Sequence, residues 1–187
     1  ELLLGEKVND VVVSGASGGV GSIALMILNK LGCNVTAVTG KSNNIEYLKS
    51  LGAKNVINTN DLTKDARPLD KGFWDGAVDT VGGKVLENIL SQTKDSGIVA
   101  SCGNAADIKL NTTVMPFIIR GVKLWGINSV TVSNVRRKFL WNEVSKLVDF
   151  GLLSKSIKEI SLEEVQDVYP KMLKGETSGR YIINLSK

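Results

Sequence analysis

The stretch that decides the fold is residues 11–22, VVVSGASGGVGS, in which a short apolar run leads into a glycine-rich turn. The valines at 11–13 are typical of a buried strand, and apolar residues then recur at helical spacing from Ile23 to Leu31. Gly32 is expected to stop that helix. A helix that follows such a turn presents free N–H groups and the positive end of its dipole to an anion. The stretch therefore predicts a strand, an anion-binding turn and a helix in succession.

Apolar runs alternate with helical patterns along most of the chain. This alternation favours a parallel sheet covered on both faces, which is a doubly wound Rossmann arrangement of the α/β class. The further strands are expected at residues 34–38, 55–57, 76–79, 98–102 and 122–127, and helices at residues 45–51 and 85–90.

The pattern changes from Asn134 onwards. The expected elements are a long helix ending at Gly151, a strand at residues 157–160, a helix that opens with a capping box of Ser161 and Glu164 and ends at Gly175, and a strand at residues 181–183. We therefore divide the chain into a Rossmann domain at residues 1–151 and a short C-terminal α+β segment at residues 152–187.

The composition is that of an ordinary globular domain of 187 residues with a net charge of +4. Its basic residues are scattered, so no nucleic-acid partner is expected. The apolar runs, such as Leu2 to Leu4, are far shorter than the roughly 18 residues that span a bilayer. We therefore expect no membrane-spanning helix, no secretory signal and no membrane partner.

The chain has no histidine, and its two cysteines, Cys33 and Cys102, lie in separate segments. These facts exclude His-based catalysis and a Ser-His-Asp triad, and they leave almost no possibility of a zinc site. Free thiols are typical of the reducing cytoplasm, where we expect the protein to work. The chain opens at Glu1 within sequence that reads as helical or connecting, which suggests that it is part of a longer protein.

The glycine turn partly matches the dinucleotide fingerprint. Gly18 would let the backbone approach a pyrophosphate, Gly21 would let the helix pack closely, and Ala16 stands where the first glycine is usual. The turn is not a Walker A motif, because Val20 and Gly21 stand where that motif requires glycine and lysine. The alternative interpretation is a packing turn that binds no ligand.

The end of the second expected strand indicates which dinucleotide is bound. NAD sites usually carry an Asp or Glu there, whereas this chain has Thr39, Gly40, Lys41 and Ser42. A hydroxyl, an open backbone and a cation suit the 2′-phosphate of NADPH. The alternative is that Lys41 is a solvated charge at the start of a helix.

Several segments together carry a likeness to a known family. They are residues 11–22, 47–53 (YLKSLGA), 67–69 (RPL), 74–82 (WDGAVDTVG), 112–118 (TTVMPFI), 120–121, 126–130 (GINSV), 159–162 and 179–180. The chain resembles the zinc-independent medium-chain dehydrogenase/reductases, and within them the quinone oxidoreductase branch typified by bacterial acryloyl-CoA reductase. Residues 67–69 and 116–130 are the segments most specific to this branch.

The resemblance implies a GroES-like substrate domain first, then the Rossmann domain, and then a return to the substrate domain. Residues 152–187 would be that return, without the N-terminal part of the substrate domain. It also implies NADPH as cofactor and direct hydride transfer to an electron-poor alkene or quinone, such as an acryloyl-CoA-type enoyl thioester, without metal. No catalytic residue is assigned, because the proton donor would lie in the absent part.

The resemblance also implies the roles of individual residues toward the cofactor. The pyrophosphate would bind at Gly18, Gly19, Val20, Gly21 and Ser22, the 2′-phosphate at Thr39, Gly40 and Lys41, the adenosine phosphate at Arg67, the adenosine ribose at Val81 and Gly82, and the nicotinamide at Cys102, Gly103, Asn128 and Ser129. Two alternatives stay open: Arg67 is a plain surface arginine, and Cys102 is a plain buried cysteine.

A homodimer is also expected from the resemblance, because related reductases join edge strands. The residues concerned are Phe117, Ile118, Ile119, Leu124 and Trp125, around the last expected strand of the sheet. Ordinary core packing explains these apolar residues equally well.

Two other functions compete with that of a medium-chain reductase. A short-chain dehydrogenase requires a tyrosine followed four residues later by lysine, but leucine follows Tyr47, Tyr169 and Tyr181 at that spacing. That class is excluded. A cofactor-binding module or fragment that turns over no substrate of its own remains the alternative.

Overall fold

The computed structural model describes residues 8–187, so the Leu2 to Leu4 run and Glu1 lie outside the described residues. The predicted Rossmann sheet is confirmed: six parallel strands lie in the order β3-β2-β1-β4-β5-β6. The strands are β1 (Asp10–Val13), β2 (Asn34–Thr39), β3 (Asn55–Asn58), β4 (Trp74–Asp79), β5 (Thr93–Ser101) and β6 (Lys123–Gly126). The strand order reverses between β1 and β4, and open parallel sheets bind ligands beyond such a point.

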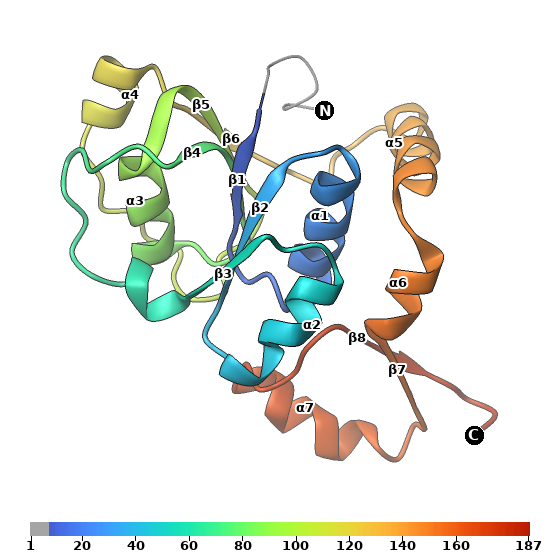
Figure 1. Cartoon of the computed structure of the whole chain (residues 1–187). Helices are drawn as coiled ribbons and strands as arrows, with labels where there is room; N and C mark the ends of the chain where they lie inside the picture. The colour runs from blue at the N-terminus through green and yellow to red at the C-terminus, as the bar shows by residue number, and fades with distance from the viewer. Residues whose placement is uncertain (1–7) are drawn as a thin grey trace.

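Helices cover both faces of the sheet (Figure 1), and each face has its own apolar cluster. The helices of the first face are α1 (Gly19–Lys30) and α2 (Ile45–Ser50), and those of the second are α3 (Gly83–Ser91) and α4 (Met115–Arg120). Val11 and Val13 pack in the first cluster, whereas Val12 packs in the second. The valine run is therefore continuous because β1 is buried on both faces.

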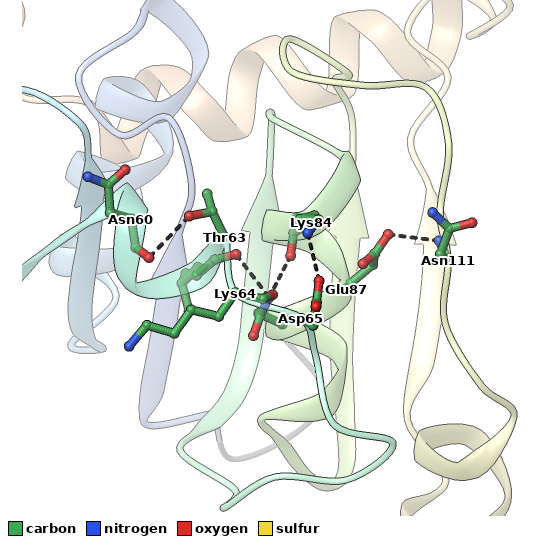
Figure 2. Close-up of polar contacts among 9 residues, drawn as sticks. Asn60, Thr63, Lys64, Asp65, Lys84, Glu87 and Asn111 are labelled. Atoms are coloured by element: carbon green, nitrogen blue, oxygen red, sulfur yellow. Dashed lines mark hydrogen bonds and ion pairs between the residues drawn. The ribbon is translucent and has the colours of Figure 1, made fainter.

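The connector between β3 and β4 is held against α3 by polar contacts. It includes the 3₁₀ helix η2 (Thr59–Leu62), and a second one, η1 (Ser42–Asn44), precedes α2. Lys84 of α3 pairs with Asp65 at 2.7 Å, and Glu87 accepts the N–H of Asn111 at 2.8 Å (Figure 2). The buried carboxamide of Asn88 donates to the carbonyls of Leu62, Lys64 and Lys84 at 3.0, 2.8 and 2.9 Å. The bonds to Leu62 and Lys64 satisfy connector carbonyls and tie the connector to α3.

Of the C-terminal residues 134–187, the last strands and the last helix lie below the carboxyl edge of the sheet, and the first helix lies beside α1 (Figure 1). Their elements are α5 (Asn134–Leu147), α6 (Phe150–Lys155), β7 (Ile157–Ile160), α7 (Val165–Leu173) and β8 (Arg180–Ile183), with β7 and β8 paired in parallel. The N–H of Gly179 donates to the carbonyl of Ser17 at 2.8 Å. The segment before β8 thus rests directly on the glycine-rich turn.

Some expected boundaries were wrong. The helix expected to end at Gly151 is instead two helices, because Val148 is extended and the Asp149 carboxylate caps the N–H of Leu152 at 3.0 Å. Gly151 lies inside α6, which also spans the 151/152 boundary, and the division into domains stays a prediction. The helix α4 was not expected, and β5 begins five residues earlier than expected, at Thr93.

Other local predictions are confirmed. Ser161 and Glu164 make both bonds of the capping box, at 3.3 and 2.7 Å, although α7 itself begins at Val165. Gly32 and Gly175 follow α1 and α7 with positive φ of 83° and 68°.

None of the helices within residues 8–187 has the length and apolar character that a membrane span requires. Cys33 and Cys102 are both free thiols.

Candidate functional site

A cleft of about 1030 Å³ lies between the carboxyl edge of the sheet and the C-terminal segment. Its walls come from the turn after β1, the ends of β2 and β4, and the residues around β8. Among the predicted site residues, those that line it are Gly18, Gly19, Thr39, Gly40, Lys41 and Val81. The structure therefore brings the glycine turn and the end of β2 together in one cleft.

The close packing of the glycine turn against α1 requires a position without a side chain. Gly18 is the N-cap of α1, and its N–H donates to the carbonyl of Gly15 at 2.9 Å. A Cβ at Gly21 would lie 2.4 Å from the Gly15 carbonyl oxygen and 2.7 Å from Cα of Ala16. Only glycine at position 21 lets the first turn of α1 approach the loop this closely.

Asp79, fully buried at the end of β4, joins the two turns that frame the cleft. Its carboxylate accepts the Ser14 hydroxyl at 2.6 Å and the Gly82 N–H at 3.0 Å. The Ser14 hydroxyl accepts the Thr80 N–H at 2.9 Å, and the Thr80 hydroxyl donates to the Ser14 carbonyl at 3.0 Å. The buried charge is thus hydrogen-bonded, and the turn after β1 is fixed relative to the turn after β4.

The end of β2 presents a hydroxyl and a cation to the cleft. The Thr39 hydroxyl lies 3.3 Å from that of Ser17 and accepts the N–H of Lys41 at 3.2 Å. The Lys41 ammonium donates to the carbonyl of Thr177 in the C-terminal segment. Burial lowers the pKa of Lys41, as does the nearby charge of Lys158, while Glu176 acts in the opposite direction. Lys41 is therefore not the freely solvated charge of the alternative interpretation.

The C-terminal segment contributes residues to the cleft that the sequence did not predict. Arg180 donates from its guanidinium to the carbonyl of Gly19 at 3.0 Å, at the head of α1. Lys174, Glu176 and Tyr181 also line the cleft. The family resemblance at residues 179–180 was the signal in the sequence that pointed to Arg180. It did not show that these residues lie next to the glycine turn.

The remaining predicted residues near the turn and strands do not line this cleft. Val20 is exposed on α1, Gly21 and Ser22 are buried in the first turn of α1, and Gly82 is buried in the turn after β4. Gly103 packs on β4, where a Cβ would lie 2.5 Å from the Thr80 carbonyl oxygen. Apart from Val20, these residues are packed within or beside the turns and do not line the cleft.

Cys102 and Arg67 are both exposed, and neither lines the cleft. The alternative that Cys102 is a plain buried cysteine is therefore wrong. Its thiol donates to the carbonyl of Asp79 at 3.3 Å, which places it beside the end of β4. Arg67 lies in the connector between η2 and β4, and its contact with the adenosine phosphate stays a prediction.

Asn128 and Ser129 line a second cavity of about 450 Å³, between α1 and α5. The Asn128 side chain accepts the N–H of Val130 at 2.9 Å, and Arg137 donates to the Ser129 carbonyl at 2.8 Å. The walls of this cavity are mainly apolar, with Ile23, Trp141 and Phe150 among them. These two residues therefore line a different cavity from the glycine turn.

No group of three or more His, Cys, Asp and Glu side chains in residues 8–187 is arranged to hold a metal ion.

The six-stranded parallel sheet with its glycine-rich first crossover defines a Rossmann-type domain. Residues 19–150 match the zinc-binding dehydrogenase family, and the chain belongs to that family. The predicted likeness to quinone oxidoreductases and acryloyl-CoA reductases is confirmed by its relatives.

Three relatives illustrate the similarity. The chain is 42% identical over 177 residues to the probable acrylyl-CoA reductase AcuI of Escherichia coli K12, covering 95% of this chain and 54% of that protein. It superposes on the yhdH oxidoreductase of Salmonella enterica in complex with NADP, with a TM-score of 0.91, 41% identity and coverage of 95% and 54%. It superposes equally widely on Bacillus subtilis protein yhfP with NAD bound, with a TM-score of 0.85, 41% identity and coverage of 95% and 54%. The chain spans about half the length of the relatives it matches.

Proposed function

We propose that this chain is the NADPH-binding part of an oxidoreductase that works without zinc. The proposal rests on one observation: the glycine turn at the head of α1 and Lys41 line the same cleft. The relative from Salmonella enterica, whose fold this chain shares closely, was solved with NADP. The cleft, of about 1030 Å³, is also as large as the larger ligand-binding pockets of proteins.

The diphosphate would lie at the head of α1, beside Arg180. Gly19 has no Cβ, and one placed there would lie 3.0 Å from the guanidinium carbon of Arg180. The arginine can therefore reach the helix terminus, where backbone N–H groups and the helix dipole favour an anion. Its further N–H donors can bind phosphate oxygens.

The 2′-phosphate would bind at Thr39, Gly40 and Lys41, where the position lacks the carboxylate that is usual in NAD sites. The ribose would lie near Val81 and Gly82. Cys102, Gly103, Asn128 and Ser129 would border the nicotinamide, because β5 and β6 end at the same edge of the sheet as β4.

A nicotinamide held there would supply a hydride to an electron-poor alkene or quinone, and a proton from a donor that is not assigned in this chain would complete the reduction. The proposed substrate class is an enoyl thioester of the acryloyl-CoA type or a quinone. The role of this chain's residues is to bind and orient the dinucleotide: the Asp79 network fixes the two turns, and Arg180 and Lys41 neutralise phosphate charge. The chain spans 54% of its relatives, which favours a second candidate, cofactor binding without turnover by this chain alone.

We also propose a cytoplasmic homodimer joined at the edge strand β6. Ile118, Leu124 and Trp125 are exposed at this edge, and Trp125 keeps 53% of its surface accessible. An exposed apolar edge strand is a surface that pairs readily with a second copy. Light scattering that gives the mass of a single chain at all concentrations would contradict this assembly.

The experiment that tests the function is a titration with NADPH and NADH, repeated on Lys41→Ala. Loss of the Lys41 ammonium should weaken the binding of NADPH by about 1–3 kcal/mol and leave the affinity for NADH nearly unchanged. Reductase activity toward acryloyl-CoA and a quinone is measured on the same samples. Binding without activity would favour the second candidate, and binding of neither dinucleotide would overturn both.

A further inference from the structure

The adenosine end of the cleft carries a carboxylate as well as cations. Lys41 and Lys174 line this end, and Glu176 lines it with them. Glu176 belongs to the loop that joins α7 to β8, and its charge acts on the Lys41 ammonium. A single cationic pocket would be the simplest site for a 2′-phosphate, so the carboxylate calls for an explanation.

The loop that carries Glu176 is fixed at both ends. Gly175 turns the chain with a φ of 68°, and the N–H of Glu176 donates to the carbonyl of Lys171 at 2.9 Å. At the other end, Gly179 donates to Ser17 of the glycine turn at 2.8 Å. Between them, the Lys41 ammonium donates to the carbonyl of Thr177, the residue after Glu176. The backbone of Glu176 is therefore fixed next to the residue that Lys41 binds, and Glu176 lines the same cleft as Lys41.

We propose that Glu176 is a specificity-determining residue that opposes the 2′-phosphate and so lowers the preference for NADPH over NADH. The inference rests on the proposed function, because it assumes that the 2′-phosphate binds at Lys41. The phosphate carries close to two negative charges at neutral pH, so a neighbouring carboxylate repels it. NADH has only a hydroxyl at that position and experiences no such repulsion.

The size of the effect follows from the exposure of Glu176. The side chain is accessible to solvent, so water and salt screen the repulsion. A like-charge repulsion that is screened in this way changes affinity about two- to fivefold. The change should shrink when the ionic strength is raised.

The test is a titration of the whole chain with NADPH and NADH, comparing the native protein with Glu176→Gln. Glutamine keeps the length and polarity of the side chain and removes only its charge. Glu163→Gln is the matched control, because Glu163 is an exposed carboxylate of the same C-terminal segment that does not line the cleft. Each titration is run at low and at high salt.

Glu176→Gln is expected to lower the Kd for NADPH about two- to fivefold at low salt and to leave that for NADH unchanged. The Glu163→Gln variant should leave both unchanged. An unchanged or raised Kd for NADPH in Glu176→Gln, while the native protein still binds NADPH, would overturn the inference and spare the proposed function. A native protein that binds neither dinucleotide would overturn the proposed function itself.

Discussion

Gly21 is the residue on which the closeness of α1 to its preceding turn depends. Its φ is not positive, so its role is to leave space and not to adopt an unusual backbone conformation. The atoms that a Cβ would meet are backbone atoms of Gly15 and Ala16, which cannot rotate away as a side chain can. The N–H groups that would bind the diphosphate are positioned by the same contact.

Gly21→Ala should therefore push α1 away from the turn. We expect NADPH affinity to fall at least about tenfold and the free energy of unfolding to fall by about 1–3 kcal/mol, as for other overpacked positions. Gly126→Ala in β6 is the control, because a Cβ there meets no atom within 4 Å. Dinucleotide titration and urea denaturation measure the two effects. Native affinity in Gly21→Ala would show that the turn does not bind the diphosphate.

The elements that were predicted well are those whose signals are local. β1 and α1 were predicted because a doubly buried strand, a glycine turn and an amphipathic repeat follow one another without interruption. The position of Lys41 in the cleft was also predictable, because the strand β2 must end at the same edge as β1.

The elements that were missed depend on contacts between distant segments or on single caps. A lone Asp149 side chain separates α5 from α6, and the apolar pattern runs through the break without a signal. The short helix α4 is an exception, because proline within its first turn and Gly121 after it, in the left-handed conformation, are local signals that could have predicted it. Arg180 was missed as a site residue because its partner, Gly19, lies 161 positions away along the chain. No local pattern can indicate such a pairing.

At the scale of the whole molecule, one ion cluster ties three strands together at the amino edge of the sheet, opposite the cleft. Lys94 of β5 lies 2.8 Å from Asp10 of β1 and 3.0 Å from Asp75 of β4. Asp75 also accepts the N–H of Asp10 at 2.8 Å. The cluster joins segments that are far apart in sequence, so it contributes only once the whole sheet has formed.

The cluster makes stability depend on pH in a defined direction. The hydrogen bond from Lys94 lowers the pKa of Asp10, so this stabilisation is complete above the carboxyl's ordinary value near about pH 4 and is lost as the pH falls through the folded-state value. The bond to Asp10 raises the pKa of Lys94, so this stabilisation is complete below the ammonium's ordinary value near about pH 10 and is lost as the pH rises through the higher folded-state value. Between these limits the Lys94 ammonium attracts both carboxylates.

Lys94→Met should therefore lower the free energy of unfolding by about 0.5–1 kcal/mol near neutral pH, since the side chains are only partly buried. Urea denaturation followed by tryptophan fluorescence measures the difference, and Lys109→Met, at an exposed position, controls for the loss of charge and the added apolar surface. The difference between the native protein and Lys94→Met should shrink as the pH is lowered below about 4, where the carboxylates are protonated. A difference that stays constant through that range would contradict the assignment of this stabilisation to the charge of Lys94.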